Sequence, residues 1–120
     1  MLFFQLGLNS LQQSLLKNIS LEERLKKVTD DVVQYFSAYF CRLWLVRKGD
    51  KCETCMHAQA KAPMHACQNR EKCLHLIASS GRYTGLDSPI RGRVPLGSCK
   101  VGKIAMSNVP KFYVGDIGAF

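Results

Sequence analysis

The chain has 120 residues, 47% of them hydrophobic, and carries a formal net charge of +8. This length predicts a single domain, and the apolar fraction is too high for a disordered chain. No apolar run approaches the roughly 20 residues that span a bilayer. The first residues also lack the basic stretch of a signal peptide. We therefore expect a cytoplasmic protein, in which thiols stay reduced and clustered cysteines indicate metal or redox chemistry.

A first helix is predicted over about residues 9–17, where leucines recur at helical spacing. We assign residues 1–19 to a linker or dimerisation helix, and residues 20–120 to one domain. A homodimer through the N-terminal helices is the expected assembly. A helix docked on its own domain fits the same pattern equally well, because a short isolated helix is marginal in water.

A second helix begins more sharply, because Ser20 and Glu23 have the S-x-x-E spacing of a capping box. Apolar residues then recur on one face, and charged residues lie largely off it. This helix is expected to cover a sheet with the face formed by Leu21, Leu25, Val28, Val32 and Phe36.

Two main strands are predicted at residues 40–46 and 73–79, with Gly49-Asp50 and Ser80-Gly81 as the breaks that follow them. The segment between them shows no helical pattern, which favours an antiparallel pair. Three shorter elements follow: an edge strand at 93–96, a helix at 101–106 and a last strand at 112–114. The sequence thus predicts an α+β fold. Its central antiparallel sheet is backed by N-terminal helices, and a long cysteine-rich loop joins the first two strands.

Four cysteines crowd that loop with the spacing C-x2-C-x11-C-x5-C: Cys52, Cys55, Cys67 and Cys73. A C-x2-C pair lets two thiolates face one ion, and the other two can complete a tetrahedral site of four sulfurs. His57 or His65 could replace one thiolate. Such a closed site is structural and suits zinc. An iron–sulfur cluster would use the same thiolates and would make the loop a redox sensor.

Other thiols and histidines have simpler interpretations. Cys41 and Cys99 are isolated in the sequence and are expected to be structural thiols. His75 lies between two leucines, so a hydrogen-bonded histidine is favoured over a ligand. Cys73 opens a strand and could be a buried apolar residue, as free cysteines often are.

No catalytic constellation is visible. The sequence contains no serine-nucleophile motif, no paired carboxylates at useful spacing and no phosphate-binding glycine loop. We therefore expect a protein that is not an enzyme. Thiol–disulfide exchange at Cys52 and Cys55 is the remaining enzymatic hypothesis, although their flanking residues indicate a loop and not the helix start that such pairs prefer.

Five passages, which together extend over most of the chain, resemble a GAF domain, the small-molecule sensor module of signalling proteins. They are residues 25–36, 41–45, 77–81, 94–105 and 116–117. The cysteine-rich segment is similar to that of a cysteine-bearing subgroup found in bacterial and archaeal sensor kinases.

The resemblance implies a GAF- or PAS-like sensor domain that binds a small molecule and regulates a histidine kinase or another output domain. It also implies a short helix that lids the ligand pocket, with Gly97, Val101 and Gly102 at the lid. A GAF domain usually continues for some tens of residues beyond the position of Asp116-Ile117. This one is therefore expected to be incomplete at its C-terminus.

The net charge leaves a second hypothesis, a small zinc-binding module that holds nucleic acid through a basic surface. The basic residues are spread along the chain, and aromatic residues are not interleaved with them. A solvated surface is therefore favoured over a nucleic-acid site, and we expect no membrane partner. Salt-dependent binding to a generic duplex would distinguish this hypothesis from the sensor domain.

Overall fold

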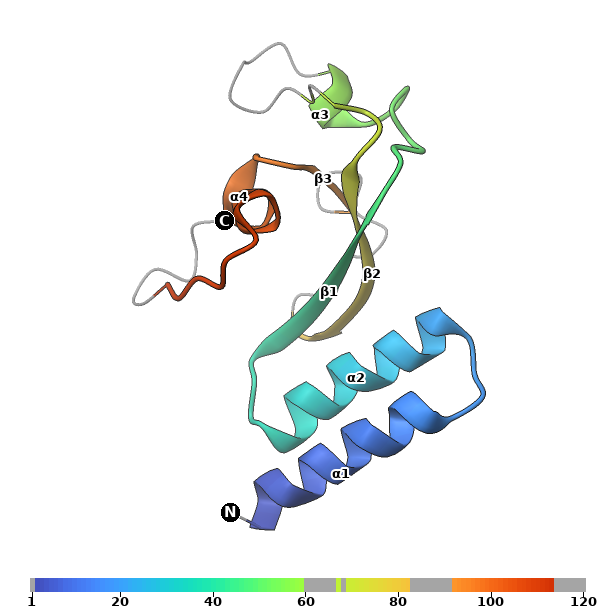
Figure 1. Ribbon diagram of the computed structural model, residues 1–120, viewed down its shortest axis with the longest axis vertical. Coiled ribbons are helices and arrows are strands. Elements are labelled where there is room, and N and C mark those ends of the chain that lie inside the picture. Colours follow the sequence, from blue (N-terminus) through green and yellow to red (C-terminus); the bar gives the residue numbers. More distant parts are fainter. Residues whose placement is uncertain (1, 60–66, 68, 83–91, 114–120) are drawn as a thin grey trace. The chain divides into compact units, whose positions relative to one another are not determined.

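The computed structural model describes residues 2–59, 67, 69–82 and 92–113 (Figure 1). These residues form an α+β fold with four helices and a three-stranded antiparallel sheet of order β1-β2-β3, which confirms the predicted fold class at this level. Among them, no helix is both long and apolar enough to cross a membrane. The elements are α1 (Leu2–Leu16), α2 (Leu21–Tyr35), β1 (Phe40–Arg47), α3 (Met56–Gln59), β2 (Cys73–Gly81), β3 (Arg93–Pro95) and α4 (Cys99–Ser107).

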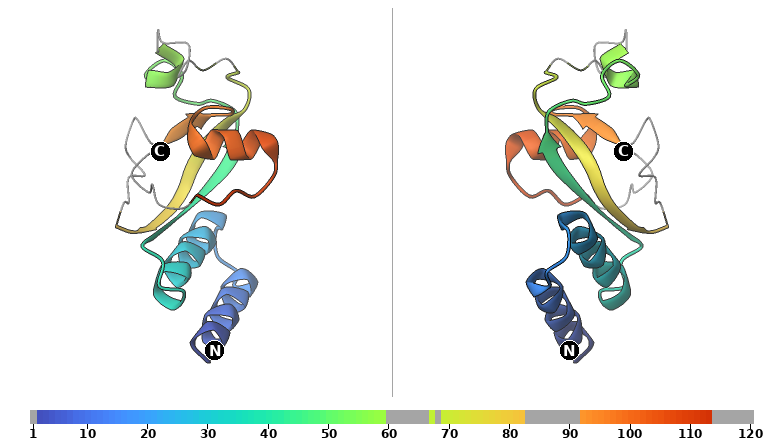
Figure 2. Two further views of the ribbon diagram at one scale, coloured as in Figure 1. Left: turned by 90° about the vertical axis from the view of Figure 1, so that its left-hand side faces the viewer. Right: turned by 90° about the vertical axis from the view of Figure 1, so that its right-hand side faces the viewer.

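Contacts divide the chain into two units, residues 1–45 with 76–87 and residues 46–75 with 88–120. In the first unit α1 lies alongside α2 (Figures 1 and 2). Gly7 permits this close approach, because a Cβ atom there would lie 2.6 Å from the Cβ of Tyr35. The Ser10 hydroxyl donates to a carboxylate oxygen of Asp31 at 2.7 Å, and Ser14 is almost fully buried. Small and polar residues of α1 therefore face α2. Phe3 and Phe4 also pack there, with ring centroids 5.6 Å from that of Tyr35 and 5.3 Å from that of Phe36, respectively.

The start of α1 differs from the prediction. The helix begins at Leu2 and not near Asn9, so Ser10 lies inside it and bonds to α2 instead of capping its first turn. The segment before Asn9 contains Phe3, Phe4 and Gly7, which are weak helix formers, so packing along α2 supplies the support that a short helix lacks on its own.

The predicted start of α2 is confirmed, since Ser20 is the N-cap and its hydroxyl accepts from the backbone N–H of Glu23 at 3.2 Å. The expected apolar face is partly buried: Leu25, Val28, Val32 and Phe36 are half-buried, whereas Leu21 is 45% exposed. The most buried residues of α2 are the polar Thr29 and Asp31, which were not predicted. Polar contacts therefore add to the packing of this helix.

Those contacts join α2 to the end of β2. The Thr29 and Ser80 hydroxyls lie 2.7 Å apart, and the Lys26 ammonium donates to the carbonyl of Ser79 at 2.9 Å. Ser80 also donates to Asp30, and burial alone would raise the pKa of that carboxyl. The hydrogen bonds from Ser80 and Lys26 outweigh burial and lower it. These buried polar groups satisfy one another, as buried polar groups must.

The two main strands differ in burial. β2 is buried along almost its whole length, whereas β1 is half-buried and its last two residues are exposed. The predicted turn at Ser80 and Gly81 is wrong, because both residues belong to β2. Gly81 has a φ of 94°, and a Cβ there would lie 2.4 Å from the carbonyl oxygen of Tyr39. A glycine that makes this close approach is hard to distinguish in sequence from one that makes a turn.

The second unit contains the antiparallel pairing of β2 with β3, in which Cys73 faces Pro95 and His75 faces Arg93. Helix α4 follows and packs on β3 through Gly102, where a Cβ would lie 2.4 Å from the Pro95 carbonyl oxygen. The short helix α3 interrupts the cysteine-rich segment, for which no helix was predicted.

The last predicted strand, at 112–114, is wrong for the residues that the structure describes there. Residues 111–113 have no regular structure, and Phe112 is 94% exposed. An apolar, aromatic run of three residues is too short a signal to separate a strand from a loop. Val114 lies outside the described residues.

Candidate metal site

One small cavity in the second unit is lined by all four cysteines of the cysteine-rich segment. Its volume is about 10 Å³, close to what a single bound water requires. The thiols come from the turn after β1, from the segment after α3 and from the first residue of β2. The lining comprises Gly49, Asp50, Lys51, Cys52, Cys55, Ala58, Cys67, Arg70, Cys73, Arg93 and Pro95.

Backbone hydrogen bonds position three of these cysteines. The carbonyl of Lys51 accepts from the N–H of Cys55 at 2.7 Å, which forms the tight turn between the two cysteines of the C-x2-C pair. The N–H of Cys67 donates to the carbonyl of His57 at 2.8 Å, which ties the returning chain to α3. Cys73 is fixed as the first residue of β2. Residues distant in sequence therefore converge on one place.

Gly49 closes one edge of the cavity. Its N–H donates to the Arg70 carbonyl at 2.8 Å, and a Cβ on it would lie 2.7 Å from the sulfur of Cys52. The sequence predicted Gly49 only as a strand break. The structure shows a further reason for glycine here, because a thiol and the chain around Arg70 lie too close for a side chain.

All six cysteines of the chain are free thiols. In the part of the chain that the structure describes, no group of three or more histidine, cysteine or acidic side chains is arranged to hold a metal ion. The four thiols share a cavity without converging on one point.

The surroundings of Cys73 disfavour its thiolate form. Burial, followed by the neighbouring Cys67, Cys55 and Cys52, raises the pKa of Cys73 to about 11.

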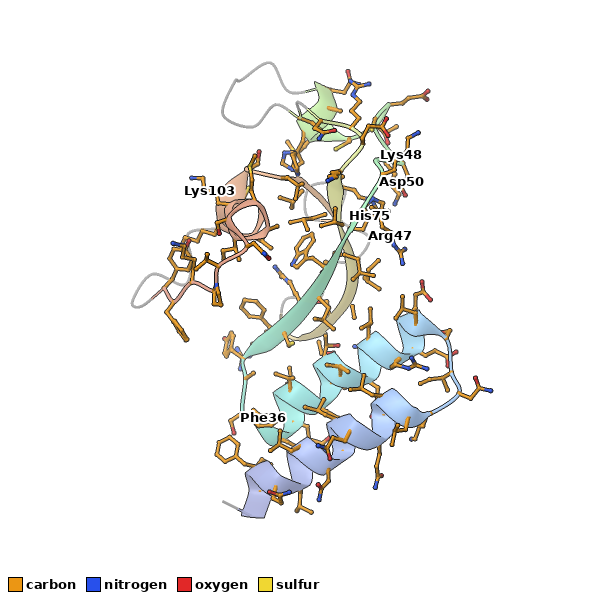
Figure 3. All side chains as sticks on the ribbon, in the orientation of Figure 1. Phe36, Arg47, Lys48, Asp50, His75 and Lys103 are labelled. Carbon is orange, nitrogen blue, oxygen red and sulfur yellow. The ribbon has the colours of Figure 1, made fainter. Side chains whose placement is uncertain are left out.

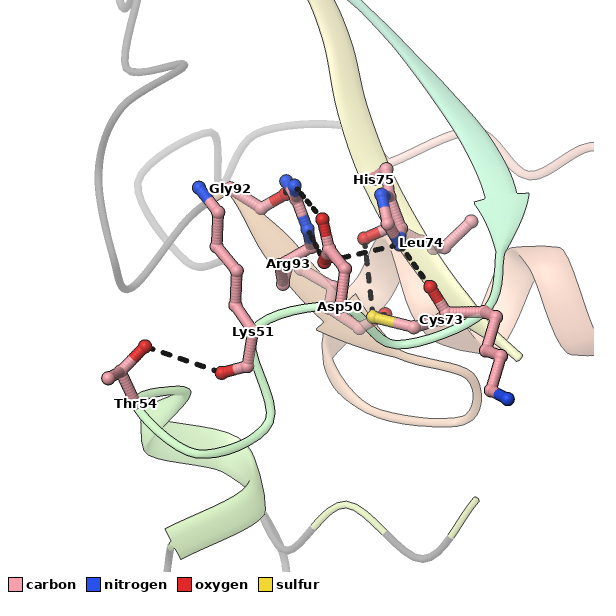
Figure 4. Close-up of polar contacts among 10 residues, drawn as sticks. Asp50, Lys51, Thr54, Cys73, Leu74, His75, Gly92 and Arg93 are labelled. Carbon is pink, nitrogen blue, oxygen red and sulfur yellow. Dashed lines mark hydrogen bonds and ion pairs between the residues drawn. The ribbon is translucent and has the colours of Figure 1, made fainter. Parts of the chain in front are cut away.

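Arg93 on β3 carries a positive charge near the thiol of Cys73 (Figure 4). The guanidinium of Arg93 donates two hydrogen bonds to the carboxylate of Asp50, at 2.8 and 2.9 Å. This pairing lowers the pKa of Asp50 to about 2, and the same hydrogen bonds raise the pKa of Arg93. The Arg93 side chain is only 16% exposed, so water screens its charge less than that of a surface arginine.

His75 lies next to this pair on β2 (Figure 3). Its Nε2 is 3.0 Å from the Lys48 carbonyl oxygen and 3.8 Å from Asp50. Burial, and after it the charge of Arg93, lowers the pKa of the imidazole. This is the buried, hydrogen-bonded histidine that the sequence favoured.

The other predicted site residues lie elsewhere. His57 is buried on α3 but is not among the residues that line the cavity, and His65 lies outside the described residues. Gly97, Val101 and Gly102 belong to the turn after β3 and to α4, and none of them is among the lining residues, although Gly102 packs against Pro95, which is. Their proposed role as a ligand lid stays a prediction.

Cys41 and Cys99 are half-buried thiols that do not line the cavity, in keeping with their isolation in the sequence. Sequence reasoning missed Asp50 and Arg93 as members of the site. Their separation of 43 residues in the chain gives no local signal. Only the pairing of β3 beside the start of β2 brings them to the thiols.

No family model, no curated protein and no solved structure matches this chain. The likeness to GAF domains therefore rests on the sequence passages given above.

Proposed function

We propose that this chain is a regulatory sensor domain of a signal-transduction protein, with a metal ion held by Cys52, Cys55, Cys67 and Cys73. The observation that carries the metal site is that these four thiols, spread over the cysteine-rich segment, line one cavity. The donor set fits a thiophilic ion, since soft thiolates favour zinc, copper(I) and iron–sulfur centres. The assignment as a sensor rests on the resemblance to GAF domains.

The protein's own part in binding is to bring the thiols together and to let them turn inward. The backbone bonds at Lys51, Gly49 and Cys67 hold the three segments of the cavity wall. Binding would require the four sulfurs to converge, and rotation of each cysteine side chain about its Cα–Cβ bond would contribute to that movement. When bound, the ion would neutralise the thiolates and cross-link these segments.

β2 offers a direct route from the metal site to the N-terminal helices. It begins at Cys73, which lines the cavity, and ends at Ser79 and Ser80, which bond to Lys26 and Thr29 of α2. A change in the cysteine-rich segment that shifts β2 would alter those bonds. The signal would pass from there to a histidine kinase or another output domain.

Elemental analysis of protein purified without oxygen tests the metal site. We expect bound metal in the natural chain and its loss in a C52S/C55S double variant, because two of the four donors are removed. A C99S variant is the matched control, since Cys99 is a half-buried thiol away from the cavity, and it should keep its metal. Natural protein that contains no metal under these conditions, and takes up none, would contradict the proposal.

A homodimer through α1 is the second part of the proposed function. Leu2–Leu16 contains no charged residue, although the chain carries +8. Two like-charged copies can meet most easily on an uncharged face. Four side chains, spaced as in a coiled-coil seam, form a stripe on α1 beside its contact with α2, and three of them are about half exposed: Phe4, Leu8, Leu11 and Leu15.

A charge on that stripe should separate the copies. We expect an L8E/L15E double variant to be monomeric by light scattering, because dimerisation would bury two carboxylates per copy without partners. Gln13 lies on another side of the same helix, and a Q13E variant should remain dimeric. If the natural chain is monomeric at all concentrations, α1 is not a dimer interface.

A further inference from the structure

The two cysteines of the C-x2-C pair lie on one tight turn. The carbonyl of Lys51 accepts from the N–H of Thr54 at 3.1 Å and from the N–H of Cys55 at 2.7 Å. The Thr54 hydroxyl donates to the same oxygen at 3.4 Å (Figure 4). A hydrogen bond from a backbone N–H to the carbonyl four residues earlier closes a helical turn. Cys52 and Cys55 therefore lie three residues apart on such a turn.

This spacing brings the two side chains close to the separation of a disulfide. Residues three apart on a helical turn have Cβ atoms about 5–6 Å apart, whereas a disulfide requires about 3.5–4.5 Å. Glu53 and Thr54, the residues between the cysteines, are exposed, so little packing opposes a small tightening of the turn. Both cysteines also line the same cavity. The turn can therefore close into a disulfide with a movement confined to itself.

The other two thiols of the cavity are placed differently. Cys73 is only 6% exposed, and its thiol donates to main-chain carbonyls of β2 and β3 at 3.7 and 3.8 Å. The Cys67 thiol donates to the Asn69 carbonyl at 3.7 Å. Cys52 and Cys55 are half-buried and flank exposed residues. Because oxidation of a thiol requires access, a small oxidant reaches this pair more easily than it reaches Cys73.

Gln59, at the end of α3, bonds to both members of the pair. Its N–H donates to the Cys55 carbonyl at 3.1 Å, and its side-chain amide donates to the Cys52 carbonyl at 3.2 Å. A change in the geometry of the turn would therefore alter the hydrogen bonds that attach α3 to it.

We propose that Cys52 and Cys55 form a reversible disulfide, for which hydrogen peroxide is the oxidant. One thiolate attacks a peroxide oxygen, the O–O bond breaks, and a sulfenic acid forms. The hydroxide that leaves takes up the proton released by that thiol. The second thiol then attacks the sulfenic sulfur, the S–O bond breaks, and water leaves. Two thiols and one hydrogen peroxide thus give one disulfide and two waters, and two electrons pass from sulfur to oxygen.

The disulfide would regulate the metal site, and this regulatory part rests on the function proposed above. A sulfur in a disulfide is no longer a thiolate, and the thiolate is the metal ligand. Closing the pair therefore withdraws two of the four donors, so the reduced chain binds the ion and the oxidised chain releases it. The pairing itself needs no ion.

Reduced, metal-free natural chain treated with an equimolar amount of hydrogen peroxide tests the pairing. We expect the six free thiols to fall by two. After cleavage behind Glu53, the peptides that carry Cys52 and Cys55 should stay joined until a dithiol is added, and tandem mass spectrometry identifies the joined cysteines. A C99S variant is the matched control and should also lose two thiols, because Cys99 does not line the cavity. In a C55S variant, Cys52 should stop at the sulfenic acid, which dimedone traps.

The outcomes separate this inference from the proposed function. No disulfide, or pairings scattered among the four cysteines of the cavity, would overturn the assigned pair and leave the metal site standing. In Zn²⁺-loaded protein, peroxide should release zinc in step with disulfide formation, and an oxidised chain that keeps its ion would overturn the regulatory role. A chain that forms this disulfide but binds no metal when reduced would support the pairing and overturn the metal site together with its regulation.

Discussion

If the proposed metal site is occupied, a chelator that removes the ion will lower the stability of the cysteine-rich segment more than any single substitution outside it. An ion present at 1,000 times its Kd stabilises the folded state by about 4 kcal/mol. For a chain of this size, that loss lowers the midpoint of thermal unfolding by roughly 10–20 °C. The expected loss is large because little else orders the described residues between β1 and β2: α3 has only four residues, and the buried apolar side chains of the described chain lie on β2 and β3.

Amide hydrogen exchange will show where the stability is lost. We expect residues 49–59 and 69–73 to exchange faster after chelation, whereas α1 and α2 keep their protection, because their mutual contacts and the bond between Ser10 and Asp31 do not involve the cavity. The C52S/C55S variant serves as the control and should not respond to the chelator. A natural chain whose unfolding midpoint is the same with and without chelator would show that no ion orders this segment.

The thiol cavity illustrates what the sequence could predict. The C-x2-C spacing fixes two thiols in one tight turn, and a cysteine at the start of a strand has a defined place, so their grouping followed from local rules. The contribution of β3 to the cavity could not be predicted from local rules. Arg93 reaches the site only through its pairing opposite His75, and strand pairing over such a distance leaves no periodic trace in a single sequence.

The N-terminal helices illustrate where local rules fail. Helical spacing of leucines predicted the first helix but not its contacts: Gly7, Ser10 and Ser14 lie against α2, and Phe3 and Phe4 pack at its end. On α2 the buried positions are Thr29 and Asp31. Their burial is acceptable only because partners on α1 and β2 satisfy them, and those partners cannot be identified before the fold is known. Hydrophobic periodicity identifies a helix more reliably than it identifies the side that packs.

The strands show the same division between local and tertiary information. The start of β2 at Cys73 and the start of β1 at Phe40 agree with the predicted boundaries, because an aromatic and β-branched run begins at Phe40 and an apolar run follows the charged residues before Cys73. The end of β2 does not agree, because Ser80 and Gly81 have the composition of a turn. They continue the strand since Ser80 is bonded to Thr29 and since Gly81 fits against the chain that enters β1.

The close approach of the chain at Gly81 predicts the second large loss of stability. A G81A variant should lose about 3–4 kcal/mol in free energy of unfolding, which is measured by urea titration with far-UV circular dichroism. Two causes act together. The φ of 94° is unfavourable for any residue with a Cβ, and that Cβ would lie 2.4 Å from the Tyr39 carbonyl oxygen and 2.6 Å from the Cα of Phe40. Both obstacles are backbone atoms, so relief requires the start of β1 to move.

Gly97 separates the two causes. Its φ of 87° is similar, but the nearest atom to an added Cβ is the flexible thioether sulfur of Met106 at 3.2 Å. A G97A variant should therefore lose only the conformational part, about 1–2 kcal/mol. The difference between the two variants measures the close approach of the chain before β1 to the end of β2. If G81A and G97A lose the same free energy, the two segments do not touch at Gly81, and the glycine serves the backbone conformation alone.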